Sequence, residues 1–144
     1  MGIYFISHRD NLNNNACITP WSIIHFSSGI MFIILNILVF KINTFWKIFI
    51  IYNLLHLIYE IKDYCMTNYQ GMRNYVKINI NESLAKWSIT NSVVNCYCDQ
   101  IIFCCGLLFG YYIFYIKKLT NLIYPTSIML FIVWLYFINN KKLK

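Results

Sequence analysis

The sequence predicts an all-α integral membrane protein, a four-helix bundle in which one longer loop joins the second and third helices. Hydrophobic residues make up 59% of the 144 residues and charged residues only 12%, whereas a soluble domain averages about 25% charged residues. Four apolar segments, at 21–40, 45–62, 92–116 and 122–138, are each long enough to cross a bilayer as a helix. We therefore expect residues 1–144 to form a single multi-pass transmembrane domain.

The basic residues predict the orientation in the membrane. The net charge of +7 comes from lysines and arginines beside the apolar segments, where they favour anionic lipid headgroups. Because no basic stripe with an aromatic platform accompanies them, we expect a lipid bilayer and no nucleic acid as partner.

The side that holds both termini carries Arg9, Lys62, Arg73, Lys77, Lys86, Lys141, Lys142 and Lys144. The other side carries Lys41, Lys47, Lys117 and Lys118. This asymmetry places both termini in the cytoplasm according to the positive-inside rule.

Three of the four spans carry polar residues at helical spacing. In the first span the polar and small residues on one face are Ser22, His25, Gly29 and Asn36. In the second span they are Asn53, His56, Glu60 and Asp63. In the third span they are Asn91, Asn95, Asp99, Gly106 and Gly110. Spacings of three and four residues put each set on one helix face, and we expect these faces to point inward.

The polar stripes should meet at one depth. A charge at the centre of a bilayer costs at least roughly 2.5–3.5 kcal/mol, so intramembrane ionisable groups face a packed or watery interior. We therefore expect His25, Glu60 and Asp99 to point into a common space near the cytoplasmic face, lined by His56 and Asn95. The uncharged fourth span should be a lipid-facing brace, and the segment 64–90 should cover the cluster, with a short helix from Asn81-Glu82-Ser83 as a lid.

Three sequence blocks carry a family resemblance. Residues 20–25 read PWSIIH, residues 59–63 read YEIKD, and residues 91–95 read NSVVN and are followed by Asp99 and Gly106. In order and spacing these blocks resemble those of the VanZ-like family of small bacterial multi-pass membrane proteins. The resemblance implies an all-helical membrane fold with a polar intramembrane cluster, and it implies no established reaction.

The sequence departs from the family pattern at three positions. Ser22 stands where the family has a first histidine, His56 stands where it has a glutamate, and Asn91 stands where it has an aspartate. An activity that requires the histidine pair therefore depends on His56 as the second imidazole.

The residues of the expected cluster fit three kinds of use. The first is membrane-embedded acid–base hydrolysis of a lipid-like substrate, with His25, Glu60 and Asp99 as catalytic candidates. Supporting polar residues would be Ser22, His56, Asp63, Asn91, Ser92 and Asn95, and an asparagine amide would stabilise an oxyanion. The second is a divalent metal site, zinc or iron, on His25, His56, Glu60 and Asp99. The third is purely structural: polar contacts that hold together a component of a membrane or envelope assembly.

The six cysteines are predicted to be unbonded. Cys96, Cys98, Cys104 and Cys105 lie inside the third span, where buried thiols act as small apolar groups. Cys17 and Cys65 flank the first two spans on the side predicted to be cytoplasmic, where a reducing compartment argues against a disulfide.

Overall fold

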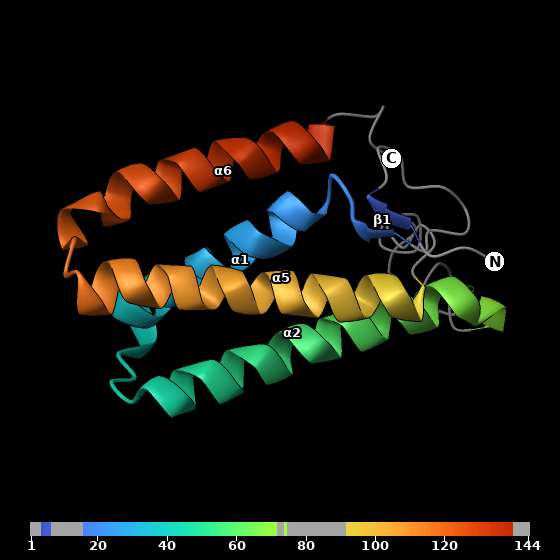
Figure 1. The fold of residues 1–144 in the computed structure, drawn as a ribbon, viewed down its shortest axis with the longest axis horizontal. Coiled ribbons are helices and arrows are strands. Elements are labelled where there is room, and N and C mark those ends of the chain that lie inside the picture. The colour runs from blue at the N-terminus through green and yellow to red at the C-terminus, as the bar shows by residue number, and fades with distance from the viewer. Residues whose placement is uncertain (1–3, 7–15, 72–73, 75–91, 140–144) are drawn as a thin grey trace.

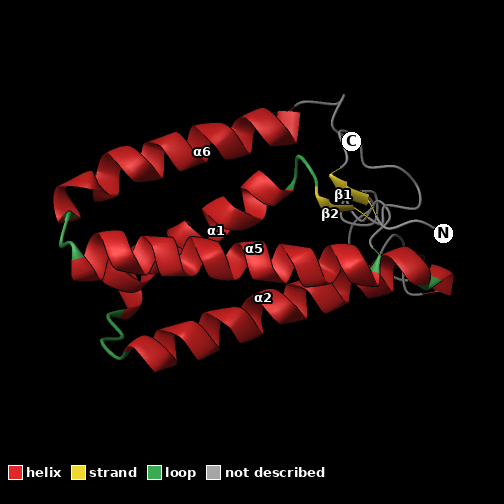
Figure 2. Ribbon diagram, in the orientation of Figure 1, coloured by secondary structure: helices red, strands yellow, loops and turns green. Residues whose placement is uncertain are grey.

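The computed structural model describes residues 4–6, 16–71, 74 and 92–139. Four long helices dominate it (Figures 1 and 2). Their bounds are α1 Ser22–Leu35, α2 Phe45–Asn68, α5 Val93–Tyr111 and α6 Ile123–Asn139. Helices α1 and α5 each continue into a π-helical turn, Asn36–Phe40 and Tyr112–Ile116, and a short 3-10 helix, Thr120–Leu122, leads into α6.

The predicted helical class is confirmed, with one addition near the N-terminus. Strands β1 (Tyr4–Ile6) and β2 (Ala16–Ile18) pair in parallel, with Tyr4 opposite Ala16 and Ile6 opposite Ile18. The prediction did not include them, because a three-residue strand is too short to show a period of two. Strand β2 packs against α5 and so brings the N-terminal segment to the start of that helix.

Three helical segments are long and apolar enough to cross a membrane: Ser22–Phe40, Val93–Ile116 and Thr120–Phe137. They lie within two residues of three of the predicted spans. Helix α2 contains the predicted span 45–62 but is not among these segments, because Lys47, Asn53, His56, Glu60 and Lys62 lower its apolar character. These helices support a membrane protein, while the count of four spans and the orientation stay predictions.

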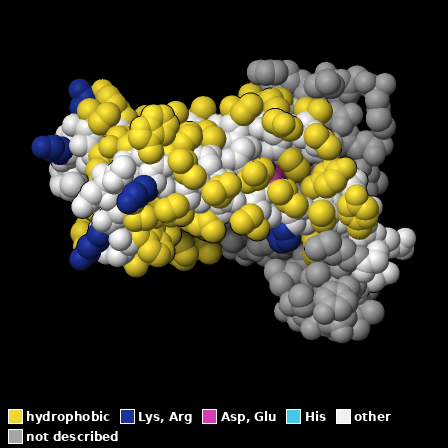
Figure 3. Space-filling model, turned by 90° about the horizontal axis from the view of Figure 1, so that it is seen from below, with side chains coloured by type: hydrophobic (Ala, Val, Ile, Leu, Met, Phe, Trp, Pro, Cys, Tyr) yellow, Lys and Arg dark blue, Asp and Glu magenta, His cyan; other side chains and the backbone are white. Residues whose placement is uncertain are grey.

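The outer surface supports the same conclusion. Large apolar side chains are exposed along α2 and α6, among them Ile50, Ile58, Ile128 and Phe131, each more than half accessible. Figure 3 shows hydrophobic side chains over most of one face, with several lysine or arginine side chains gathered at one end. Apolar patches this extensive indicate a lipid or protein environment rather than water.

The closest helix pair is α1 and α5. At Gly29, an added Cβ would lie 2.6 Å from the Leu107 amide nitrogen and 2.8 Å from the Gly106 carbonyl carbon. At Gly106, it would lie 2.9 Å from the Phe26 carbonyl carbon. Only hydrogen fits at these positions, so the glycines allow the two backbones to touch, as small residues do in membrane helix pairs.

A set of polar side chains around Asn36 joins three segments at the C-terminal end of α1. The Asn36 side chain, fully buried, donates to the Ile42 carbonyl at 2.8 Å and to the Tyr115 hydroxyl at 2.6 Å. It also accepts a hydrogen bond from the Tyr52 hydroxyl at 3.1 Å. These partners come from α2, from the turn before it and from the π-helical turn after α5. Asn36 therefore fixes these ends of the helices relative to one another.

Helix α6 lies beside α1 (Figure 1). The Trp134 indole donates to the Ser27 hydroxyl at 2.7 Å, and Phe137 packs on Trp21 with ring centroids 5.8 Å apart. Its other face is exposed and apolar, as expected for a brace at the edge of the structure.

Candidate functional site

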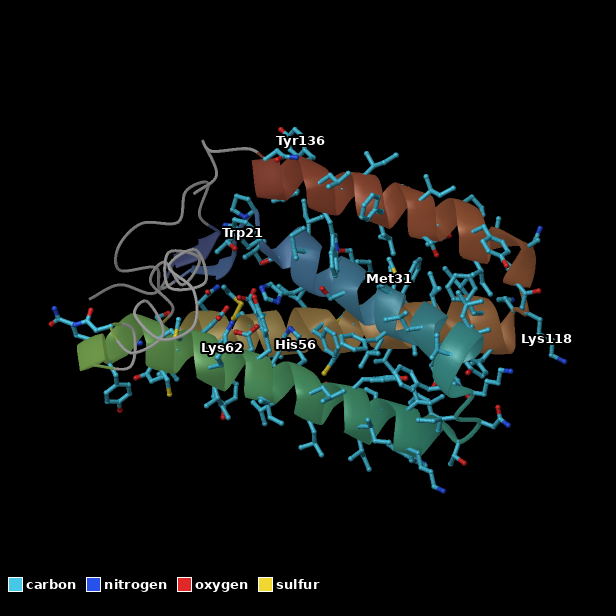
Figure 4. All side chains as sticks on the ribbon, turned by 180° about the vertical axis from the view of Figure 1, so that it is seen from behind. Trp21, Met31, His56, Lys62, Lys118 and Tyr136 are labelled. Atoms are coloured by element: carbon cyan, nitrogen blue, oxygen red, sulfur yellow. A yellow bond between two sulfur atoms is a disulfide. The ribbon has the colours of Figure 1, made fainter. Side chains whose placement is uncertain are left out.

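Two histidines and a glutamate from α1 and α2 form a compact triangle. His25 Nδ1 lies 3.0 Å from His56 Nε2, and each of these nitrogens lies 3.4 Å from Glu60 Oε1. His56 and Glu60 stand one turn apart on α2, and Figure 4 shows the His56 side chain pointing from α2 into the space between the helices. His56 is 5% exposed and Glu60 2%, so this chemistry is enclosed by protein.

Asp99 approaches the other side of the His25 ring. Its Oδ2 lies 3.4 Å from His25 Nε2, and the residue is 2% exposed. The structure therefore brings together the four ionisable residues that sequence analysis grouped: His25, His56, Glu60 and Asp99. Their roles as catalytic groups or metal ligands stay predictions.

The protonation of His56 is set by a chain of amides. The Gln100 Nε2 donates to Asn53 Oδ1 at 2.7 Å, so Gln100 Oε1 is the atom that faces His56 Nδ1, at 2.8 Å. Because a carbonyl oxygen only accepts, the proton of the neutral ring sits on Nδ1. Nε2 then carries the lone pair and points into the triangle with His25 and Glu60.

The ring of His56 is also held by packing. It stacks on Phe103 with centroids 4.0 Å apart and an interplanar angle of 12°. Phe103 is fully buried in the core formed by α1, α2 and α5. Stacking and the Gln100 hydrogen bond together leave the imidazole one orientation.

Asn95 lies one turn before Asp99 on the same face of α5. It is 6% exposed, and its Nδ2 has no hydrogen-bond partner among the residues that the structure describes. Its backbone amide is bonded to Ser92 Oγ at 3.1 Å, which caps the start of α5. The side-chain amide is therefore a donor available to a ligand beside the cluster.

The remaining predicted supporting residues lie apart from the triangle. Ser22 Oγ accepts from the Thr19 amide at 3.0 Å and closes the first turn of α1. Ser92 is a helix cap, and Asp63 forms an ion pair with the adjacent Lys62. Asn91 lies outside the described residues, as does most of the predicted covering loop with its lid helix.

Sequence analysis missed the amide chain behind His56. Gln100, Asn53 and Cys104 form it, and Cys104 Sγ donates to Asn53 Oδ1 at 2.6 Å. The signal was present, because Gln100 and Cys104 stand one turn apart beside Asp99 within an apolar span. Gln100 and Cys104 meet Asn53 only because α2 packs against this face of α5.

The prediction that all cysteines are unbonded is wrong. Cys17 in β2 and Cys98 in α5 form a disulfide, with their Cα atoms 5.1 Å apart. Sequence analysis compared Cys98 only with its helix neighbours and could not foresee that β2 folds back onto α5. The free cysteines are Cys65, Cys96, Cys104 and Cys105, as expected.

Comparison of the chain with protein-family models, with curated proteins and with solved structures finds no match. The resemblance to the VanZ-like family therefore stays a prediction.

Proposed function

We propose that this chain is a multi-pass membrane protein that holds a zinc ion on His25, His56 and Glu60 and uses it to hydrolyse a lipid-like substrate. The observation that carries the proposal is the triangle of His25 Nδ1, His56 Nε2 and Glu60 Oε1, with edges of 3.0, 3.4 and 3.4 Å. These three atoms are also a group close enough together to hold one metal ion.

Two of the three edges match tetrahedral zinc, and the His25–His56 edge of 3.0 Å is shorter than the tetrahedral separation. Zinc binds histidine nitrogen and carboxylate oxygen at about 2.0–2.2 Å, so two of its ligands in a tetrahedron are about 3.3–3.5 Å apart. A hydrogen bond between the two imidazoles would account for the 3.0 Å edge. It would not account for the Glu60 oxygen at equal distance from both nitrogens.

The groups behind the ligands also favour a metal. A metal-bound histidine usually donates its other ring N–H to a carboxylate or a carbonyl. The second nitrogen of His25 faces the carboxylate of Asp99, and that of His56 faces the carbonyl oxygen of Gln100. Glu60 and Asp99 together carry two negative charges when ionised, which a divalent cation balances inside an apolar bundle.

Two histidines and one glutamate leave a fourth position open, the pattern of catalytic zinc sites. Zinc in such a site makes a bound water a nucleophile at neutral pH. The Asn95 amide, without a partner among the described residues, would donate to the oxygen on which negative charge develops. Asp99 holds the His25 ring and so acts as a positioning residue.

The surroundings of the site suggest the substrate class. The outward faces of α2 and α5 around the cluster are apolar, with Ile58, Ile61 and Ile101 each more than half exposed. A molecule that reaches the site from the bilayer must keep its apolar part in lipid while its ester or phosphoester group meets the polar cluster. A lipid-like substrate has this form.

The metal content of the purified protein tests the proposal directly. The wild type in detergent should carry about one zinc per chain by elemental analysis. Glu60→Gln, His25→Gln and His56→Gln should lose it while remaining folded by circular dichroism. Asp63→Asn is the matched control on the same helix, because Asp63 pairs with Lys62 outside the triangle. Zinc lost equally from Asp63→Asn would contradict the ligand set.

Asp99→Asn separates a positioning role from ligation. It should weaken zinc binding about 10–100-fold without abolishing it, because an amide orients the imidazole less well than a carboxylate. Hydrolysis is then measured by mass spectrometry of mixed phospholipid vesicles incubated with the zinc-loaded wild type and with Glu60→Gln. A wild type that binds no zinc, with full stability in all variants, would leave the cluster as a packing element of a structural membrane protein.

A further inference from the structure

We infer that the Cys17–Cys98 disulfide places the site end of the helices, with β2 and the end of α6, on the oxidising, non-cytoplasmic side of the membrane. If the proposed function holds, the substrate then comes from the leaflet on that side. This orientation is opposite to the one that the basic residues predict.

The bridge lies at the site. Cys98 directly precedes Asp99, the residue whose carboxylate faces His25. Cys17 comes from β2, which packs against α5 and leads through Thr19 into α1. Figure 4 shows the sulfur–sulfur bond on the same side of His56 as Lys62, away from Lys118. Whatever compartment oxidises this pair is therefore the compartment that the polar cluster faces.

Formation of the bond requires an oxidant. Two thiols lose two protons and two electrons, and thiol–disulfide exchange passes the electrons to the disulfide of an oxidoreductase, which becomes a dithiol. Such oxidants act in the bacterial periplasm, the lumen of the secretory pathway and outside cells, whereas cytosolic thiols are kept reduced. The cysteines meet the geometric condition, with Cα atoms 5.1 Å apart.

The charge asymmetry is a weaker guide to orientation than the disulfide. The positive-inside rule counts Lys and Arg in short loops close to the spans. In the inferred orientation the cytoplasm receives Lys41 and Lys47 around one short turn and Lys117 and Lys118 in another. Both turns are short links between consecutive helices, and Lys41 and Lys118 adopt positive φ values there. The opposing count is larger, eight against four, and includes Lys141, Lys142 and Lys144 just after α6. The disulfide outweighs it because the bond requires an oxidising compartment, whereas charge only biases the direction of insertion.

The first experiment measures the oxidation state in cells. The wild type, expressed in a bacterial inner membrane, is acid-trapped and alkylated with a maleimide of high mass before and after reduction. Two further thiols should react only after reduction, and Cys17→Ser and Cys98→Ser should each remove this pair. Cys104→Ser is the matched control on the same helix, because Cys104 is free. Alkylation of all six thiols without reductant would overturn the inference.

The second experiment measures orientation with a pair of exposed positions at opposite ends of the last span. Lys118→Cys and Asn139→Cys are made in a background where the four free cysteines are serine and the bridge is kept. A membrane-impermeant maleimide on spheroplasts should label Asn139→Cys at once and Lys118→Cys only after permeabilisation. The reverse order, or immediate labelling of both, would overturn the inference. Zinc binding by purified protein does not depend on orientation, so this proposal and the proposed function fail separately.

Discussion

The glycine contact between α1 and α5 makes a quantitative prediction. Replacing Gly29 by alanine places a Cβ 2.6 Å from the Leu107 amide nitrogen, where ordinary contact begins at 3.4 Å. The Phe103 carbonyl oxygen lies closer still to this position, and both obstacles are backbone that cannot rotate away. The helices must therefore separate by more than the difference of about 0.8 Å. Overpacking of this kind costs typically 1–3 kcal/mol. We expect the same for Gly106→Ala, which meets the backbone of Phe26.

Two other glycines supply a graded control. At Gly110 the nearest atoms are the Ile30 Cα and the Ile33 side chain at 3.2–3.3 Å, so Gly110→Ala should cost less, about 1 kcal/mol or below. At Gly71 nothing lies within 4 Å, and Gly71→Ala should leave stability unchanged or raise it slightly.

Thermal unfolding in detergent, followed by tryptophan fluorescence, measures this order. A cost of 2 kcal/mol should lower Tm by roughly 4–8 °C in a chain of this size. The separation also acts on the site, because His25 and Asp99 lie about one to two turns from the glycine contact on these two helices. Zinc binding should therefore weaken in Gly29→Ala and not in Gly71→Ala. Equal Tm values for wild type, Gly29→Ala and Gly106→Ala would refute the close approach of α1 and α5.

Three further predictions concern two sets of hydrogen bonds and the proposed zinc site. Asn36→Leu should destabilise the protein by about 1–3 kcal/mol in the same unfolding assay, because it removes the acceptor of the buried Tyr52 hydroxyl and the donor to the Ile42 carbonyl. Stability equal to wild type would contradict a structural role for the Asn36 hydrogen bonds. Trp134→Phe should lower the free energy of unfolding by only about 0.6 kcal/mol, the usual value for a hydrogen bond between membrane helices. It should also speed proteolysis of α6. Unchanged proteolysis would show that the bond to Ser27 does not hold α6 in place. Zinc affinity, measured by competition with a chelator, should fall as the pH is lowered from 7.5 to 5.5, because protons compete for the imidazole and carboxylate ligands. An affinity independent of pH would exclude this ligand set.

Much of the helical arrangement was predictable because it follows from hydrophobic patterning. Apolar segments of about 20 residues determine where helices α1, α5 and α6 begin and end to within a few residues. Spacing by three and four determined that Asn36, Glu60 and Asp99 share the inward faces, and all three are buried. Glu60, together with Lys47, Asn53, His56 and Lys62, keeps α2 out of the set of helices apolar enough to span, so the count of four spans stays a prediction.

The sequence by itself determined which side chains face inward, because helical periodicity is a local property. It did not determine that Gln100 orients His56, or that Cys17 meets Cys98, because each pair joins segments far apart in the chain. Only the packing of α2 and β2 against α5 decided these contacts, and that packing depends on where Gly29 and Gly106 let the backbones touch. The distances of 3.0 and 3.4 Å that separate a metal site from a general polar cluster likewise exist only once three helices are in register.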